Sequence, residues 1–162
     1  MLWLRRALIG AAMGWPIALL LAPVAAARPQ SSTIGYPFAL VMYAAGRVIC
    51  HQRPERSFHL LSVQLPVCAR CLGIYAGAAL ISVIVAARPG FSPALPFGGT
   101  RHRAAAGDGR SSARTVLLIS ALPTAATLLA EWATGHAPGN WTRALSGVPL
   151  GAAVAWIVSG VR

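Results

Sequence analysis

Charged residues are scarce in this sequence of 162 residues, and acidic residues are the scarcest of all. Only 10% of the residues are charged, against roughly 25% in an average soluble domain. So few charges could not cover the surface of a soluble protein of this size, and 56% of the residues are hydrophobic. The composition therefore indicates a surface that faces lipid.

Several catalytic signatures are also missing. No Ser-His-Asp set, phosphate-cradling loop or intramembrane pair of carboxylates is evident, which argues against a hydrolase, a nucleotide-binding protein or an ion pump. Arg and Lys number 14 against three acids, for a net charge of +11, which in a soluble protein would suggest nucleic acid. Here the arginines form short clusters between apolar runs, as in cytoplasmic loops of membrane proteins. We therefore expect a lipid bilayer as the partner and no nucleic acid.

Five apolar segments predict an all-α fold, a polytopic helical membrane protein with four to five transmembrane helices. About 20 apolar residues span a bilayer as a helix. The segments are residues 7–27, 36–46, 72–87, 115–133 and 144–161. The first also has the small residues of a signal-peptide cleavage site, but its length favours an uncleaved span. The second is short for a full crossing.

The predicted organisation is an N-terminal transmembrane helix and connection, residues 1–34, followed by a cysteine-motif membrane domain, residues 35–162. Within the second part, residues 88–114 are rich in Pro, Gly, Ser and Arg and predict a flexible basic loop. This loop would be a solvated cytoplasmic linker or, alternatively, a contact with anionic lipid.

The basic residues give conflicting signals about orientation. Arg5 and Arg6 place the N-terminus in the cytoplasm, and the basic loop places residues 88–114 there too. An even number of crossings must separate the two, yet three apolar segments lie between them. The simplest solution is that residues 36–46 do not fully cross, which would put the cysteine motif at the outer face. If all three segments cross, one charge signal is overridden.

Two pairs of glycines share a spacing of four residues. Gly73 and Gly77 lie in one apolar segment, and Gly147 and Gly151 lie in another. Small residues at this spacing allow helix backbones to approach closely in lipid. A chain this rich in Gly and Ala also produces such pairs by chance, so both interpretations stay open.

All three cysteines lie in one stretch, "VICHQRPERSFHLLSVQLPVCARCLGIYAG", residues 48–77. Cys68 and Cys71 form a Cys-x-x-Cys pair just before a predicted helix, where both sulfurs face one side and the helix N-terminus stabilises thiolates. Cys50 lies across a polar loop that can fold back to supply a third thiolate. His51 or His59 would complete a tetrahedral Cys3His site, although His51 adjoins Cys50 and could instead orient the site from behind the ligands.

Zinc is the expected metal because it accepts thiolate and imidazole together and needs no electron chemistry, while iron or another transition metal is an alternative. An iron–sulfur cluster lacks a fourth cysteine, and Leu72 stands where a c-type haem motif needs histidine. A redox role would use the same residues, with Cys68 and Cys71 cycling between dithiol and disulfide. A structural disulfide with one spare thiol is the third interpretation.

The charged residues around the thiols also allow two interpretations. Arg53, Arg56 and Arg70 could balance thiolate charge and pair with Glu55, or they could be solvated loop charges. Glu131 lies near the end of an apolar segment, where an acid needs a partner, and Arg143 is the candidate. A water-exposed Glu131 at the membrane interface is the alternative.

The cysteine stretch resembles the signature of an uncharacterised prokaryotic membrane-protein family, domain of unknown function 2085. The matching motifs are Cys-His-Gln at residues 50–52, Pro-Glu-Arg-Ser-Phe at 54–58, Gln-Leu-Pro-Val-Cys-Ala-Arg-Cys at 64–71 and Gly-Ile-Tyr at 73–75. Residues 140–151, "NWTRALSGVPLG", resemble the family's closing helix. The resemblance covers roughly residues 35–160 and implies a small polytopic membrane protein with a Cys-His and Cys-x-x-Cys pairing. It implies no activity.

The expected function is a non-enzymatic integral protein of a prokaryotic inner or plasma membrane, whose metal site pins a loop to a transmembrane helix. The rival from another class is a membrane thiol–disulfide oxidoreductase using Cys68 and Cys71. A third hypothesis is an accessory subunit of a larger membrane complex, with a purely architectural metal site.

Overall fold

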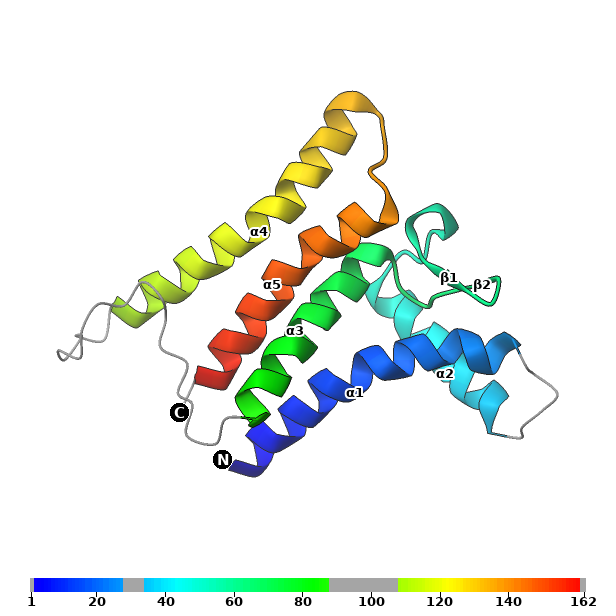
Figure 1. Cartoon of the computed structure of the whole chain (residues 1–162), viewed down its shortest axis with the longest axis horizontal. Coiled ribbons are helices and arrows are strands. Elements are labelled where there is room, and N and C mark those ends of the chain that lie inside the picture. The colour runs from blue at the N-terminus through cyan, green and yellow to red at the C-terminus, as the bar shows by residue number, and fades with distance from the viewer. Residues whose placement is uncertain (1, 28–33, 88–107, 161–162) are drawn as a thin grey trace.

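The fold is built from helices, as the sequence predicts. We describe a computed structural model of the chain, covering residues 2–27, 34–87 and 108–160. The helices are α1 (Leu2–Ala27), α2 (Gly35–Ile49), α3 (Ala69–Ala87), α4 (Asp108–Thr134) and α5 (Asn140–Gly160). Between α2 and α3 lie a 3-10 turn, η1 (Pro54–Arg56), and a two-stranded hairpin of β1 (His59–Leu60) and β2 (Val63–Gln64). In Figure 1, α3 and α5 lie side by side between α1 and α4.

Four helices in the described part of the chain are long and apolar enough to cross a membrane. The candidate spans are Arg6–Ala27, Ala69–Ala87, Ala113–Thr134 and Asn140–Ser159. Helix α2, which has 15 residues, is not among them. The prediction of a polytopic helical membrane protein is therefore confirmed, and the short second segment forms a helix that is not a candidate span.

One predicted boundary is wrong. The basic loop was expected to extend over residues 88–114, but α4 already begins at Asp108. The last of the Gly and Pro residues that predicted a loop is Gly109, and the residues that follow continue the helix to Thr134, with Pro123 inside it. The rest of the predicted loop, with Arg101, Arg103 and the proposed contact with anionic lipid, lies outside the described residues.

The helix ends that lie next to the basic residues are found at one end of the molecule. Figure 1 shows the start of α1, the end of α3 and the start of α4 at the same end of the helix bundle. The cysteine stretch, the end of α4 and the start of α5 lie at the opposite end. Two candidate spans, in α1 and α3, therefore lie between the start of the chain and residues 88–107, and the number of membrane crossings stays a prediction.

The contact between α3 and α5 is the most extensive in the structure. All four glycines of the two predicted pairs are buried. A Cβ added at Gly73 would overlap the backbone of Ala144, and one added at Gly151 would overlap the backbone of Ile74. The glycine spacing therefore marks a close approach of two helix backbones and is not a product of composition alone.

A small hydrophobic core lies beside the cysteines. Its buried members come from α1, α2 and the segment between α2 and α3: Leu19, Ala22, Met42, Cys50 and Val67. The ring of Trp15 on α1 contacts that of Tyr75 on α3 edge-on, with 6.1 Å between centroids. The second half of α1 therefore packs where the cysteine stretch folds back.

Candidate metal centre

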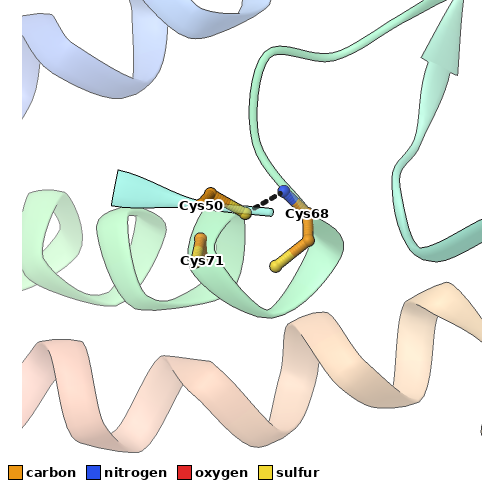
Figure 2. Close-up of side chains that lie close together, drawn as sticks. All are labelled: Cys50, Cys68 and Cys71. Carbon is orange, nitrogen blue, oxygen red and sulfur yellow. Dashed lines mark hydrogen bonds between the residues drawn. The ribbon is translucent and has the colours of Figure 1, made fainter. Parts of the chain in front are cut away.

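The three cysteines, which the chain separates by as many as 21 positions, meet at the start of α3. Their sulfur atoms all lie within 4.8 Å of one another. Cys50 directly follows α2, Cys68 directly precedes α3, and Cys71 lies in the first turn of α3. Figure 2 shows the three side chains gathered at this helix end. The predicted fold-back of the loop is what brings Cys50 to the pair.

The segment between Cys50 and Cys68, residues 51–67, is called the Cys loop below, and two glutamines hold its shape. Gln52 donates from Nε2 to the carbonyl of Tyr43, at 2.9 Å, and to that of Pro66, at 2.8 Å. Gln64 donates from Nε2 to the carbonyl of Gln52, at 2.6 Å, and the Tyr43 hydroxyl donates to the carbonyl of Gln64. These bonds tie the two ends of the loop together beside α2.

Backbone geometry at three positions completes the fold-back. Leu61 and Ser62 connect β1 to β2 with φ values of 53° and 63°, which gives the positive-φ turn that suits a tight hairpin. Gln52 also has a positive φ, 48°. Gly46 on α2 is needed because a Cβ there would overlap the carbonyl of Pro66. The Cys loop therefore packs directly on the α2 backbone.

Hydrogen bonds at the sulfurs favour thiolate. The backbone N–H of Cys68 donates to Sγ of Cys50, at 3.2 Å. The thiol of Cys71 and the backbone N–H groups of Cys71 and Arg70 donate to Sγ of Cys68 and lower its pKa to about 5, against the opposing effect of burial. Backbone donors at the first turn of a helix stabilise negative charge. These contacts favour the thiolate form of Cys68, which is the form of cysteine that binds metal ions.

The predicted histidines do not join this cluster. Among the described residues, the one group of three or more His, Cys, Asp or Glu side chains placed to hold a metal ion consists of the three cysteines. His51 and His59 are exposed, and His59 sits in β1 paired with Gln64. Ligation by a histidine stays a prediction.

The metal-ligand candidates differ in how they are covered. Cys50 is buried, in contact with the core that α1 and α2 supply. Cys68 and Cys71 are partly exposed. All three thiols are free of disulfide bonds. The sequence interpretation missed the contribution of α1 to this site, because nothing in residues 1–34 carries a ligand.

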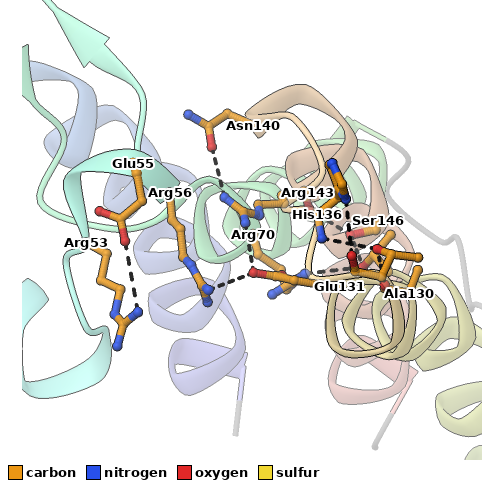
Figure 3. Close-up of polar contacts among 12 residues, drawn as sticks. Arg53, Glu55, Arg56, Arg70, Ala130, Glu131, His136, Asn140, Arg143 and Ser146 are labelled. Carbon is orange, nitrogen blue, oxygen red and sulfur yellow. Dashed lines mark hydrogen bonds and ion pairs between the residues drawn. The ribbon is translucent and has the colours of Figure 1, made fainter.

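A second polar cluster anchors the Cys loop to the hairpin of α4 and α5 (Figure 3). The buried carboxylate of Glu131 accepts from Arg143, with Nη2 to Oε1 at 3.1 Å, and pairs with Arg56 of the loop at 2.6 Å. The predicted partner Arg143 is therefore found, and the interpretation of Glu131 as water-exposed is wrong. The second partner of Glu131, Arg56, was not predicted. The sequence suggested instead that Arg56 pairs with Glu55 or balances thiolate charge.

The remaining charges and contacts of this region extend the anchoring. Arg70 donates to the hydroxyl of Thr127 on α4, at 3.3 Å, and does not pair with Glu55. Asn140 at the start of α5 donates to the carbonyl of Ser57, at 3.0 Å. The rings of Phe58 and Trp141 meet edge-on, with 5.1 Å between centroids. The loop is thus held by α4 and α5 at one side and by α2 at the other.

These features define a small helical membrane protein with a three-cysteine cluster at one end of its bundle. The chain belongs to the family described as "Predicted membrane protein (DUF2085)", which matches residues 50–157. The resemblance noted in the sequence is thereby confirmed.

Two relatives are themselves described as uncharacterized proteins. One, from Methanocaldococcus jannaschii, is 38% identical over 69 residues, which are 43% of this chain and 44% of the relative. The other, from Methanothermobacter thermautotrophicus, is 56% identical over 32 residues, 20% of this chain and 29% of the relative. The chain thus matches less than half the length of either one. No solved structure matches the chain.

Proposed function

We propose that the three cysteines bind one metal ion, zinc in the first place, and that this ion clamps the Cys loop to the start of α3. The observation that carries the proposal is the approach of all three sulfurs to within 4.8 Å of one another. Zinc sites in proteins are built from thiolates at such separations, with Cys-x-x-Cys as a common half-site.

The donor chemistry supports a metal. A disulfide would use two sulfurs and leave the third without a role, whereas a metal uses all three. Hydrogen bonds from backbone N–H groups to Cys50 and Cys68 are the kind that hold metal-ligating thiolates in place. Zinc suits this set because it binds thiolate strongly and demands no redox change, while iron would also accept the sulfurs.

The clamp would solve a problem of folding in lipid. The Cys loop carries charged and polar residues, and the lipid offers no hydrophobic drive to order it against α3. A metal bridge between Cys50 and the Cys68–Cys71 pair would fix both ends of the loop. The positive-inside pattern supports an outer-face position, because the start of α1 and the helix ends that flank residues 88–107 lie at the opposite end of the bundle.

The test is elemental analysis of the detergent-purified protein together with a thiol count under denaturing, non-reducing conditions. The expected result is about one zinc per chain and three free thiols after metal removal. Cys68→Ser should lose the metal, because a hydroxyl is a poor replacement for thiolate. The matched control, Thr134→Ser at the exposed end of α4, should keep it.

One specific feature favours a second candidate, a thiol–disulfide oxidoreductase. The lowered pKa of Cys68, in a Cys-x-x-Cys pair with Cys71, is what a nucleophilic redox cysteine needs. The dithiol would give two electrons and two protons to an acceptor such as a quinone and become a disulfide. A preparation without metal and with only one free thiol would overturn the clamp, and transfer of electrons from the reduced dithiol to a quinone would then separate this candidate from a structural disulfide.

A further inference from the structure

The cysteine cluster supplies three ligands, whereas zinc takes four. We propose that the fourth position is filled by an external small thiol, bound as its thiolate. This inference rests on the metal centre proposed above and names what that centre would bind. Three protein ligands with one open position distinguish a zinc site that exchanges ligands from a closed structural one.

No carboxylate or histidine in the described part of the chain is placed to fill the position. Oε1 of Glu131 pairs with both Arg56 and Arg143. Glu55 is exposed, and its Oε1 lies 4.0 Å from Nη1 of Arg53. Asp108 begins α4 at the opposite end of the bundle. No carboxylate therefore completes the set of ligands.

The described histidines are equally unsuited. His51 and His59 are exposed and outside the cluster, and Nδ1 of His136 lies 3.1 Å from the carbonyl of Thr134. His102 is outside the described residues.

The cover over the three sulfurs leaves one side for a ligand. Cys50 belongs to the buried cluster that includes Leu19, Ala22 and Met42, and Cys68 and Cys71 pack against that cluster, so the side formed by α1 and α2 is closed. Cys68 and Cys71 keep partial exposure, so a ligand would enter at the first turn of α3.

Charge favours a thiolate at this position. A divalent ion with three thiolates carries a formal charge of −1, and a fourth thiolate makes it −2. In the stretch from residue 47 to 71, Arg56 pairs with Glu131 and Arg53 lies near Glu55, which leaves Arg47 and Arg70 as positive charges without an acidic partner among the described residues. Such surroundings stabilise an anionic centre, and a sulfur-rich site prefers a soft ligand. On binding, the thiol releases its proton to solvent and its sulfur forms one bond to the metal, with no change of oxidation state.

The experiment uses the full-length protein loaded with Co²⁺ in place of zinc and titrated with 2-mercaptoethanol. The absorption from sulfur-to-cobalt charge transfer should saturate at a level about one third higher, because the number of thiolates rises from three to four. Elemental analysis of the titrated sample checks that the cobalt remains bound. His51→Ala and His59→Ala should show the same spectrum and the same rise as the natural sequence.

The outcomes separate this inference from the metal clamp. Protein that binds no cobalt contradicts the clamp itself. Bound cobalt whose spectrum ignores the thiol overturns the inference and leaves the clamp standing. If that spectrum also changes in His51→Ala or His59→Ala, the histidine is the fourth ligand, as the sequence predicted.

Discussion

Helix α5 packs against α3 and α4 in two different ways. Against α3 it uses glycines, which let the two backbones come into contact. Against α4 it uses polar side chains: Thr124 donates to the carbonyl of Ser146, at 2.8 Å, and Arg143 pairs with Glu131. Both kinds of contact suit a lipid bilayer, where burying apolar surface between helices gives no advantage.

The glycine contact and the polar contact serve different purposes. The glycine contact joins residues 70–77 of α3 to residues 144–152 of α5, in the halves of the two helices nearer the cysteine cluster, and fixes the separation of the two backbones there. The polar contact is concentrated toward the end where the Cys loop lies. There Glu131 reaches two partners at once, Arg143 on α5 and Arg56 on the loop.

The largest effect is expected at the ion pair. Glu131→Leu would leave Arg143, whose side chain is only 3% exposed, without its counter-charge, and would free Arg56 from the helices. Breaking a buried pair by removing one partner costs about 3–5 kcal/mol. The free energy of unfolding in detergent micelles measures this.

Glu55→Gln is the matched control, because Glu55 and Arg53 are more than half exposed and 4.0 Å apart. An exposed pair of this kind contributes only about 0–1 kcal/mol. Equal losses in the two variants would show that Glu131 has no special role in joining the loop to α4 and α5.

The next effect is expected at the glycine contact. Gly151→Ala places a Cβ against the backbone of Ile74, which cannot move as a side chain can. Overpacking of this kind costs about 1–3 kcal/mol. Gly14→Ala on α1 meets open space and should be neutral or stabilising, since alanine favours the helix. Thermal unfolding of the two variants side by side measures the difference, and a neutral Gly151→Ala would contradict the close-contact interpretation.

The comparison also explains what the sequence could predict. The membrane spans follow from composition. The glycine pairs and the Cys-x-x-Cys motif are local spacings, which indicate a close helix contact and a pair of neighbouring thiols in any fold. The pairing of Glu131 with Arg143 was accessible because α4 and α5 are adjacent along the chain. Arg56 was not, since it lies 75 positions before Glu131 and only the fold-back of the Cys loop brings them together.

The same limit applies to the cysteine site. Three thiols in one stretch predicted a cluster, and the structure forms it. The cover that α1 gives to Cys50 carries no signal in the sequence, because Leu19 and Ala22 look like any lipid-facing residues. The sequence could not choose between His51 and His59, because their positions depend on the backbone angles at Gln52 and in the β1–β2 turn. No residue pattern specifies those angles.

The smallest effect is expected for a single hydroxyl between α4 and α5. Thr124→Val removes the hydrogen bond to the carbonyl of Ser146 but keeps the shape of the side chain. Such bonds between membrane helices average about 0.6 kcal/mol. Thr134→Val is the control, because its hydroxyl bonds only within α4, to the carbonyl of Ala130. If Thr124→Val cost as much as Gly151→Ala, the two contacts of α5 would be equally strong per residue. In that case, the less extensive contact of α5 with α4 than with α3 would reflect the small number of hydrogen bonds between α4 and α5.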